Sequence, residues 1–440
     1  MPAVKKWRTG RDTILFVGYM PEGVADDLKA YGDSIDTKLK SAVIFDQKVP
    51  IYGKKAKARG ADIIIPTDFT SVSKVQKALL PIRDQLLSVT TRSDWSIPLL
   101  RKVIPHIPEL RTSSLDSLLW STDKVEMRKR FFAYDKSITP KFAIAKDSTQ
   151  ATIARIDKRV GFPCVVKPPS LAESILVSIC FHEEELQTAL RKTFSKVRSV
   201  YKKKKILDPP RVLVEEFMDG NMYSIDAYVS SRGTCTFTPM VYIKTGRSIG
   251  FDDFFGYLQI SPPNLKVTSI KEAEKVATKA IAALGLTSTS AHVELMRTEH
   301  GWKVIEVGPR TGGFRAEMYQ LSFGFSHALN DVLVRIPNKL RISKRRKGYT
   351  AAMKFFARQE GELIKLAGLK KAQGLASFHK INIRHKVGDY LLFAKHGGKS
   401  VFNIILFNKD RSKLLADIRR LEKMVKIETK KVSRRKTTAK

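Results

Sequence analysis

Two short apolar segments in the second half of the chain, residues 291–296 and 302–307, each carry one glutamate. Glu294 lies in the first segment and Glu306 in the second. If the segments form a β-hairpin that turns at residues 299–301, residues whose numbers sum to 600 face each other, as these two glutamates do. Their Cβ atoms would then lie about 5 Å apart on one face of the sheet. Because like charges at that distance destabilise a hairpin, the pattern calls for a cation beside the pair.

An arginine follows this predicted hairpin. Arg310 comes four residues after Glu306 and shares its face if the strand stays extended. Two carboxylates and an arginine suit a magnesium–nucleotide site, because carboxylate oxygens bind the ion and a guanidinium binds phosphate or carboxylate oxygens. An exposed hairpin with ordinary surface charges would carry the same residues, so this segment alone leaves both interpretations open.

Two further segments are compatible with a nucleotide site, and each is weak evidence by itself. Lys167 ends an apolar strand predicted at residues 163–167, where its amine could hold a phosphate while its stem packs. Residues 214–218 could offer backbone groups to an adenine edge, with Phe217 and Met218 as apolar surface. A lone lysine in a basic chain, or an ordinary core strand, would look the same.

The order of predicted elements divides the chain into domains. Strands alternate with helical stretches in residues 1–112, which predicts a small α/β domain. We expect a central domain over residues 113–335, with halves at 113–211 and 212–335, and a β-rich domain over residues 336–428. The predicted strands are 13–18, 42–45, 62–65, 86–89, 163–167, 211–218, 223–230, 291–296 and 302–307, and the predicted helices are 71–80, 121–135, 182–200, 269–284 and 410–424.

The chain is strongly basic, with 80 Lys and Arg against 43 Asp and Glu and a net charge of +37. This charge favours anionic partners. Basic clusters lie at residues 202–205, expected to be an exposed loop, at residues 343–347, expected to be a link, and at residues 430–436, within the last segment of the sequence, residues 426–440. We expect this last segment to be a disordered tail and place the domain boundary at 429–440. No aromatic residues are interleaved with these clusters, so nucleic acid is a partner that the sequence allows but does not favour.

Membrane association is not expected from the sequence. Residues 1–12 lack the apolar core of a signal peptide, and no run approaches the roughly 18 apolar residues that span a bilayer. The chain is therefore predicted to be cytoplasmic, with no membrane partner.

Several of these segments, taken in order, resemble the ATP-grasp superfamily. They are Asp123-Lys124, Phe162-Pro163-Cys164-Val165-Val166-Lys167-Pro168, the strand of Glu215 followed by Gly220, Glu294, and Glu306 to Gly313 (EVGPRTGG). Within the superfamily the chain is most similar to the carboxylate–amine ligases, including amino-acid ligases and D-alanine–D-alanine ligase. The likeness covers residues 120–330 well. It implies an ATP-grasp fold, of mixed α/β and α+β class, between an N-terminal α/β (pre-ATP-grasp) domain and a C-terminal β-rich domain.

The resemblance also implies roles for individual residues. Lys124 and Lys167 would contact the ATP phosphates, and Arg310 would stabilise the transferring phosphoryl group or the acyl phosphate. Lys167 and Arg310 would thus be the catalytic side chains. Glu294 and Glu306 would coordinate Mg²⁺, with Mn²⁺ as the alternative metal. The remaining implied ATP contacts are Glu215, Glu216, Phe217, Met218 and Ser174.

Three positions depart from the family pattern. The phosphate-covering loop, usually rich in glycine, reads Ser-Leu-Ala-Glu-Ser-Ile-Leu at residues 170–176. Backbone N–H groups approach a phosphate less freely there, and Glu173 would repel it. Met222 lies where the family has an acid that binds the ribose. Gly308 lies where the family often has an asparagine, two residues after the second metal glutamate. Weak nucleotide affinity, altered nucleotide choice and loss of activity are all compatible with these departures.

The resemblance therefore predicts an ATP-dependent ligase that activates a carboxylate as an acyl phosphate and transfers it to an amine or another nucleophile. Its partners would be ATP and small carboxylate and amine substrates. The alternatives are an ATP-grasp pseudoenzyme or polyanion-binding protein, and a formate ligase or carboxylase of the same superfamily. Arg247 and Arg315 are candidates to contact the substrate, and each is equally compatible with a purely structural role.

Overall fold

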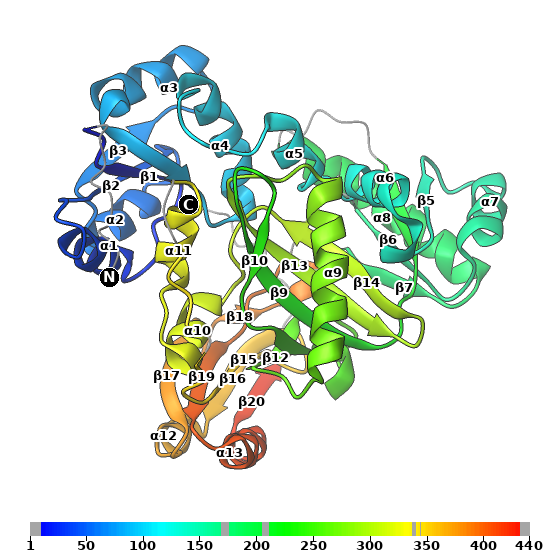
Figure 1. Ribbon diagram of the computed structural model, residues 1–440. Coiled ribbons are helices and arrows are strands. Elements are labelled where there is room, and N and C mark those ends of the chain that lie inside the picture. Colours follow the sequence, from blue (N-terminus) through cyan, green and yellow to red (C-terminus); the bar gives the residue numbers. More distant parts are fainter. Residues whose placement is uncertain (1–9, 169–175, 205–210, 337–339, 344, 432–440) are drawn as a thin grey trace.

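The computed structural model describes residues 10–168, 176–204, 211–336, 340–343 and 345–431 (Figure 1). Its N-terminal part is a parallel sheet in the order β3-β2-β1-β4, as the alternation of strands and helices predicted. The strands are β1 (Thr13–Val17), β2 (Lys40–Asp46), β3 (Ile63–Thr67) and β4 (Leu86–Thr90), and the helices around them are α1 (Val24–Asp33), α2 (Ile51–Ala58), α3 (Val72–Leu79) and α4 (Ile97–Val103).

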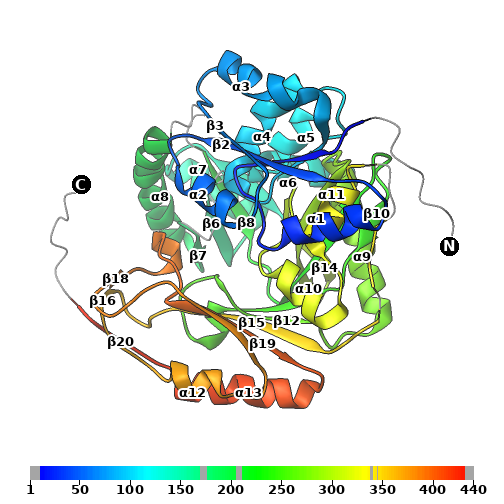
Figure 2. The same cartoon turned by 90° about the vertical axis from the view of Figure 1, so that its left-hand side faces the viewer.

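Both faces of the parallel sheet are buried. Leu15 and Val17 pack with residues of α3 and α4, whereas Ile14 and Phe16 pack with residues of α1 and of α11 (His327–Leu333). Helix α11 is the last helix of the central region in sequence, yet it lies beside the N-terminal sheet in both views (Figures 1 and 2). The central and N-terminal regions therefore share a hydrophobic core.

A small antiparallel sheet, in the order β5-β8-β6-β7, forms the first half of the central region. Its strands are β5 (Phe142–Ala145), β6 (Cys164–Lys167), β7 (Ser178–Cys180) and β8 (Val212–Glu216); the associated helices are α5 (Leu115–Trp120), α6 (Lys124–Tyr134), α7 (Gln150–Val160) and α8 (Glu183–Lys204). Because α8 continues to Lys204, the loop predicted at residues 202–205 is wrong for 202–204. Lysine is a good helix former, and its charge suits a helix C-terminus. Residues 205–210 lie outside the described part.

A long sheet, in the order β14-β13-β9-β11-β12-β15-β19-β17 with β10 beside β9, continues from the central into the C-terminal region. Its strands are β9 (Asn221–Val229), β10 (Cys235–Phe237), β11 (Val241–Thr245), β12 (Gly256–Ser261), β13 (Thr289–Thr298), β14 (Gly301–Gly308), β15 (Tyr349–Phe355), β17 (Phe378–Ile383) and β19 (Phe402–Asn408). The helices packed on it include α9 (Val267–Ala283), α10 (Arg315–Phe323) and α13 (Arg411–Met424).

A fourth sheet, in the order β18-β16-β20, lies in the C-terminal region. It consists of β16 (Gly361–Ala367), β18 (Tyr390–Leu391) and β20 (Lys426–Lys430), with the short helix α12 (Leu369–Gln373) nearby. The disordered tail predicted from residue 426 is therefore wrong for residues 426–430. Ile427 packs on the C-terminal core, and Glu428 pairs with Lys365 at 2.7 Å, which together hold the strand. Residues 432–440 lie outside the described part, and the predicted domain boundaries stay predictions.

No helix in the described ranges combines the length and the apolar character needed to cross a lipid bilayer.

The central hairpin has a β-bulge that the sequence did not reveal. Glu294 faces Glu306, as predicted, but nearer the turn Leu295 faces Val304 and Thr298 faces Gly301, one residue earlier than predicted. Ile305 is the extra residue that changes the register. A tighter turn and a compensating bulge therefore bring the two glutamates opposite each other.

Gly220 lies just before β9, where the pairing of β9 with β13 begins at Asn221 and Arg297. Its φ is +149°, and a Cβ there would lie 2.2 Å from the Arg297 carbonyl oxygen. Gly220→Ala should therefore lower the free energy of unfolding by about 2 kcal/mol or more, measured by chemical denaturation. Gly233→Ala is the control, since Gly233 also has positive φ (+78°) but open space around its Cβ position. Equal losses in the two variants would contradict the steric account.

Candidate active site

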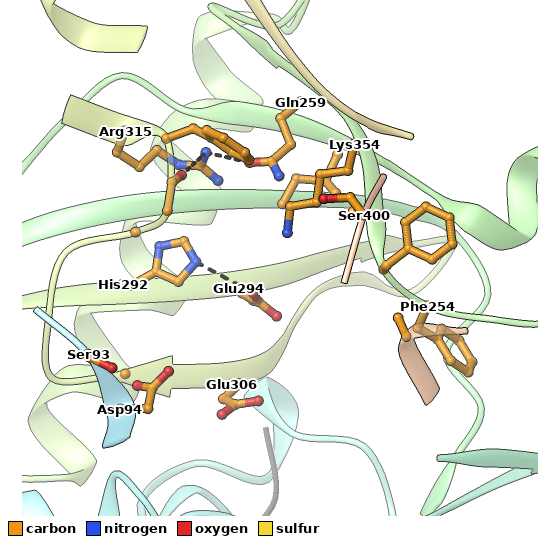
Figure 3. Close-up of a pocket in the computed structure, with 18 of the residues that line it drawn as sticks. Ser93, Asp94, Phe254, Gln259, His292, Glu294, Glu306, Arg315, Lys354 and Ser400 are labelled. Carbon is orange, nitrogen blue, oxygen red and sulfur yellow. Dashed lines mark hydrogen bonds and ion pairs between the residues drawn. The ribbon is translucent and has the colours of Figure 1, made fainter. Parts of the chain in front are cut away.

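A cavity of about 570 Å³ lies where the N-terminal, central and C-terminal regions meet (Figure 3). Its walls come from residues 92–95 after β4, from β13, β14 and the loop that follows β14, and from β12, β15 and residues 398–400. Glu294, Glu306 and Arg310 line it, so the structure brings together these three of the predicted site residues.

Glu294 and Glu306 are directly opposite each other on β13 and β14. Their side chains are 30% and 36% exposed, so both carboxylates reach solvent in the cavity. The described residues contain no cluster of three or more His, Cys, Asp or Glu side chains that could bind a metal. Two carboxylates still suit Mg²⁺, which keeps several waters and commonly takes one or two carboxylates together with substrate phosphates. The metal role of the pair stays a prediction.

Arg310 is fixed by a partner that the sequence analysis missed. Its Nε donates to Asp94 Oδ1 at 2.7 Å and its Nη2 to Asp94 Oδ2 at 2.5 Å. Burial disfavours the charged form of Asp94, but the Arg310 charge outweighs this and lowers the carboxyl pKa. Asp94 follows β4 at the carboxyl end of the parallel sheet, a common place for binding residues and the one local signal that could have found it.

Gly308, one of the three departures, lies beside the same ion pair. A Cβ at residue 308 would lie 3.4 Å from Asp94 Oδ1 and 3.7 Å from the Arg310 side chain. Both are ordinary van der Waals distances, so a Cβ at this position would fit beside the ion pair. Met222, which replaces the expected ribose-binding acid, also lines the cavity.

Lys124 contacts the glutamate pair from the first half of the central region. Its Nζ lies 3.1 Å from Glu306 Oε1. The residue before it, Asp123, caps helix α6 by accepting from the N–H groups of Val125 and Glu126. The Asp-Lys motif thus begins a helix and directs a cation towards the Glu306 carboxylate.

Lys167 lies in a buried ionic cluster and not on the cavity wall. Its Nζ is 2.6 Å from Glu215 Oε2, and Arg128 Nε is 2.6 Å from Glu215 Oε1. Arg128 also donates to the carbonyl of Ile305, the bulge residue, at 2.7 Å. The cluster therefore connects the small sheet to the hairpin that carries the glutamates.

Two backbone N–H groups of the predicted adenine-binding segment already donate hydrogen bonds to other parts of the chain. The N–H of Glu216 donates to the Lys141 carbonyl at 2.9 Å, and that of Phe217 donates to the Pro163 carbonyl at 3.0 Å. The Glu215 side chain is buried in the ionic cluster. An adenine contact would therefore use the Met218 N–H or backbone carbonyls, and it stays a prediction. Ser174 lies outside the described residues, as does most of the 170–176 loop.

A buried network behind Glu294 was also missed. The fully buried carboxylate of Asp226 lies 2.6 Å from His292 Nδ1 and 2.7 Å from His327 Nε2, and it accepts the Gly312 N–H at 2.7 Å. Burial alone would lower the pKa of His292, but the Asp226 charge raises it overall. His292 Nε2 lies 3.5 Å from Glu294 Oε1, so the network orients this glutamate and the loop after β14. His292 and Glu294 are two residues apart on one strand face, which was a readable signal.

The two candidate arginines differ in position. Arg315 lines the cavity, and its guanidinium donates to Gln259 Oε1 and Ser224 Oγ, each at 2.6 Å. Arg247 is not on the cavity wall; it lies 3.6 Å from Asp252 and over the rings of Phe217 and Phe254. Arg315 therefore shapes the cavity mainly by holding neighbouring polar side chains.

Glu215 gives a pH-dependent test of the ionic cluster. Burial opposes its charge, but Arg128 and Lys167 lower its pKa from 4.5 to about 2. Because the pKa is lowered in the folded protein, the stabilisation that the charged Glu215 gives through Arg128 and Lys167 is complete above pH 4.5. It is lost as the pH falls towards 2. Glu215→Gln should therefore cost about 3 kcal/mol of unfolding free energy at neutral pH, and this difference from the native protein should shrink in acid.

The control for this test is Glu216→Gln. Its carboxylate accepts the Lys141 N–H, which an amide oxygen can also do. A Glu215→Gln difference that stays constant from neutral pH to acid, by urea denaturation, would contradict the assignment.

Comparison with known proteins identifies the fold. Residues 160–317 match the sequence family described as the ATP-grasp domain. The chain is 27% identical over 194 residues to the D-alanine–D-alanine ligase of Bacillus velezensis, covering 43% of this chain and 49% of that protein. The chain spans about half the length of the curated relatives it matches first.

Two solved structures share the fold over nearly their whole length. The L-amino acid ligase of Bacillus licheniformis has a TM-score of 0.74 at 18% identity, covering 96% of this chain and 99% of that one. The biotin carboxylase domain of a Hydrogenobacter thermophilus 2-oxoglutarate carboxylase, solved with MgADP, ADP and bicarbonate, has a TM-score of 0.63 at 12% identity, covering 94% and 90%. The chain therefore carries an ATP-grasp domain within an ATP-grasp fold and resembles the carboxylate–amine ligases of that superfamily.

Proposed function

We propose that the protein is an ATP-dependent ligase that activates a carboxylate as an acyl phosphate and joins it to an amine. The observation that carries the proposal is the pair of facing glutamates, Glu294 and Glu306, in a cavity where Asp94 fixes Arg310. The matched ATP-grasp domain and the names of the relatives support ATP as the phosphoryl donor and an amide as the product.

The proposed reaction has two steps. A carboxylate oxygen of the substrate attacks the γ-phosphorus of ATP; the new O–P bond forms as the bond to the bridging oxygen breaks, and ADP leaves. The amine then attacks the carbonyl carbon of the acyl phosphate. The C–O bond to phosphate breaks, inorganic phosphate leaves with that carboxylate oxygen, and the amine loses a proton.

The residues of the chain act by position and charge, since phosphoryl transfer needs little covalent help from protein. Glu294 and Glu306 would hold Mg²⁺, or Mn²⁺ in its place, with His292 orienting Glu294. Bound there, the metal would neutralise charge on the phosphate oxygens. The guanidinium of Arg310, held by Asp94, would stabilise negative charge on the transferring group. Lys124 would contact a phosphate from its place beside Glu306, while Lys167, Ser174 and residues 215–218 remain the proposed nucleotide contacts.

Glu306→Gln tests the metal role. The fold should persist, because the side chain is partly exposed and an amide oxygen can still accept from its Lys124 partner. ATP turnover should fall by about 100-fold. Glu299→Gln, an exposed glutamate in the turn of the same hairpin, is the matched control and should retain full turnover. Phosphate release and circular dichroism measure the two properties, and undiminished turnover in Glu306→Gln would refute the assignment.

The dependence on both substrates tests the reaction class. Phosphate release from ATP should require a carboxylate and an amine together, because the acyl phosphate is consumed only by the nucleophile. A carboxylase would instead respond to bicarbonate. A polyanion-binding protein would release no phosphate and would bind nucleic acid with an affinity that falls steeply as salt rises. A panel screen for phosphate release, with a salt titration of RNA binding, separates the three outcomes.

A further inference from the structure

The charges that line the cavity are unequally distributed. Six Lys and Arg side chains and three carboxylates form its wall. All three carboxylates have a role in the proposed function: Asp94 binds Arg310 with both oxygens, and Glu294 and Glu306 face each other as metal ligands. Among the described lining residues, no carboxylate is therefore left to receive a substrate ammonium group, as an amino-acid substrate would require.

Several cations gather on the wall opposite the metal glutamate Glu306. Lys354 lies on β15, and Arg384 and Lys399 lie next to β17 and β19, the strands that continue the same sheet. Lys354 and Ser400 lie across the cavity from Asp94 and Glu306 (Figure 3). No acidic side chain lines the cavity from these C-terminal strands.

Asn403 connects Arg384 and Ser400 of this wall through hydrogen bonds. When the Asn403 amide is oriented to satisfy both of its ends, its oxygen accepts from Arg384 Nη2 at 3.1 Å and its nitrogen donates to Ser400 Oγ at 2.6 Å. Ser400 is buried, with 2% of its surface exposed. In that arrangement its oxygen already accepts a hydrogen bond, so its own proton is directed elsewhere. A hydroxyl donor among lysine and arginine cations is a set that binds carboxylate or phosphate oxygens.

We propose that Lys354, Arg384, Lys399 and Ser400 bind a second anionic group of the substrate. The substrate is then a carboxylate that carries another carboxylate or a phosphate at its far end, and it is not a simple α-amino acid. One anionic end lies at Glu294, Glu306 and Arg310 for activation, and the other lies against the C-terminal strands. This inference rests on the proposed function and adds the chemical class of its substrate.

Matched probes test the inference. Glutarate has a second carboxylate, phosphonopropionate has a phosphonate, butyrate has a methyl group, and γ-aminobutyrate has an ammonium group at the same end. Hydroxylamine serves as a general nucleophile and converts an acyl phosphate into a measurable hydroxamate. At least one of the two dianions should be used with a kcat/KM about tenfold or more above butyrate and γ-aminobutyrate, as expected for one charged hydrogen bond. The two dianions distinguish a carboxylate from a phosphate as the second group.

Two single substitutions test whether the preference for the dianion arises from the proposed site. Lys354→Met should lower kcat/KM for the dianion about tenfold relative to kcat/KM for butyrate, and so remove most of the preference. Lys399→Met is a second variant should the first fail to fold. Lys413→Met, an exposed lysine at the start of α13, is the control and should keep the preference.

The outcomes separate the inference from the proposed function. Equal or better use of butyrate or γ-aminobutyrate would overturn the anion site and leave the ligase proposal intact. If no carboxylate yields a hydroxamate, the proposed function fails. Calorimetric binding of glutarate and phosphonopropionate then decides the site alone: binding by the native protein that Lys354→Met loses supports it, and absent or unchanged binding overturns it.

Discussion

The contact between Glu294 and Glu306 is the constraint on which the site depends, because two like charges face each other across neighbouring strands. Such a pair is unfavourable in isolation. The surrounding groups reduce this cost from three directions: Lys124 from the first half of the central region, Arg310 from the loop after β14, and His292 from the same strand face. These groups leave both carboxylates partly exposed to the cavity. We propose a divalent ion with its nucleotide as the partner that completes this arrangement.

Buried polar groups hold these elements in register. The Lys167–Glu215–Arg128 cluster bonds to the carbonyl of Ile305, so the small sheet is connected to the bulge that sets the glutamates opposite each other. Asp226 connects β9 to His292, His327 and the backbone of Gly312. Because removal of one partner from a buried pair is costly, both clusters fix geometry more than they add net stability.

Local patterns predicted much of the fold and the centre of the site. The apolar segments gave the strands of the parallel sheet, and the spacing of glutamates gave the pairing at Glu294 and Glu306. The bulge at Ile305 was not predictable. In the sequence, a hairpin with a tight turn and one bulged residue has the same length as a hairpin with a longer turn and no bulge. The strand at Lys426–Lys430 was missed since its charge pattern resembles a tail, and only its pairing with β16 distinguishes it. Asp94, Asp226 and Lys354 were missed because tertiary folding, and not sequence spacing, brings Asp94 and Lys354 to the cavity and Asp226 behind Glu294.

In the proposed reaction, the substrate carboxylate is the nucleophile that accepts the phosphoryl group, between the metal that the two glutamates would hold and the arginine that Asp94 binds. The most direct measurement traces an oxygen atom from the substrate carboxylate into the inorganic phosphate. With a substrate whose reacting carboxylate carries a heavy-oxygen label, turnover should move one labelled oxygen into the inorganic phosphate, since the C–O bond breaks when the amine attacks. Phosphate that forms during turnover without the label would show that water and not the carboxylate attacks ATP, and it would contradict the account.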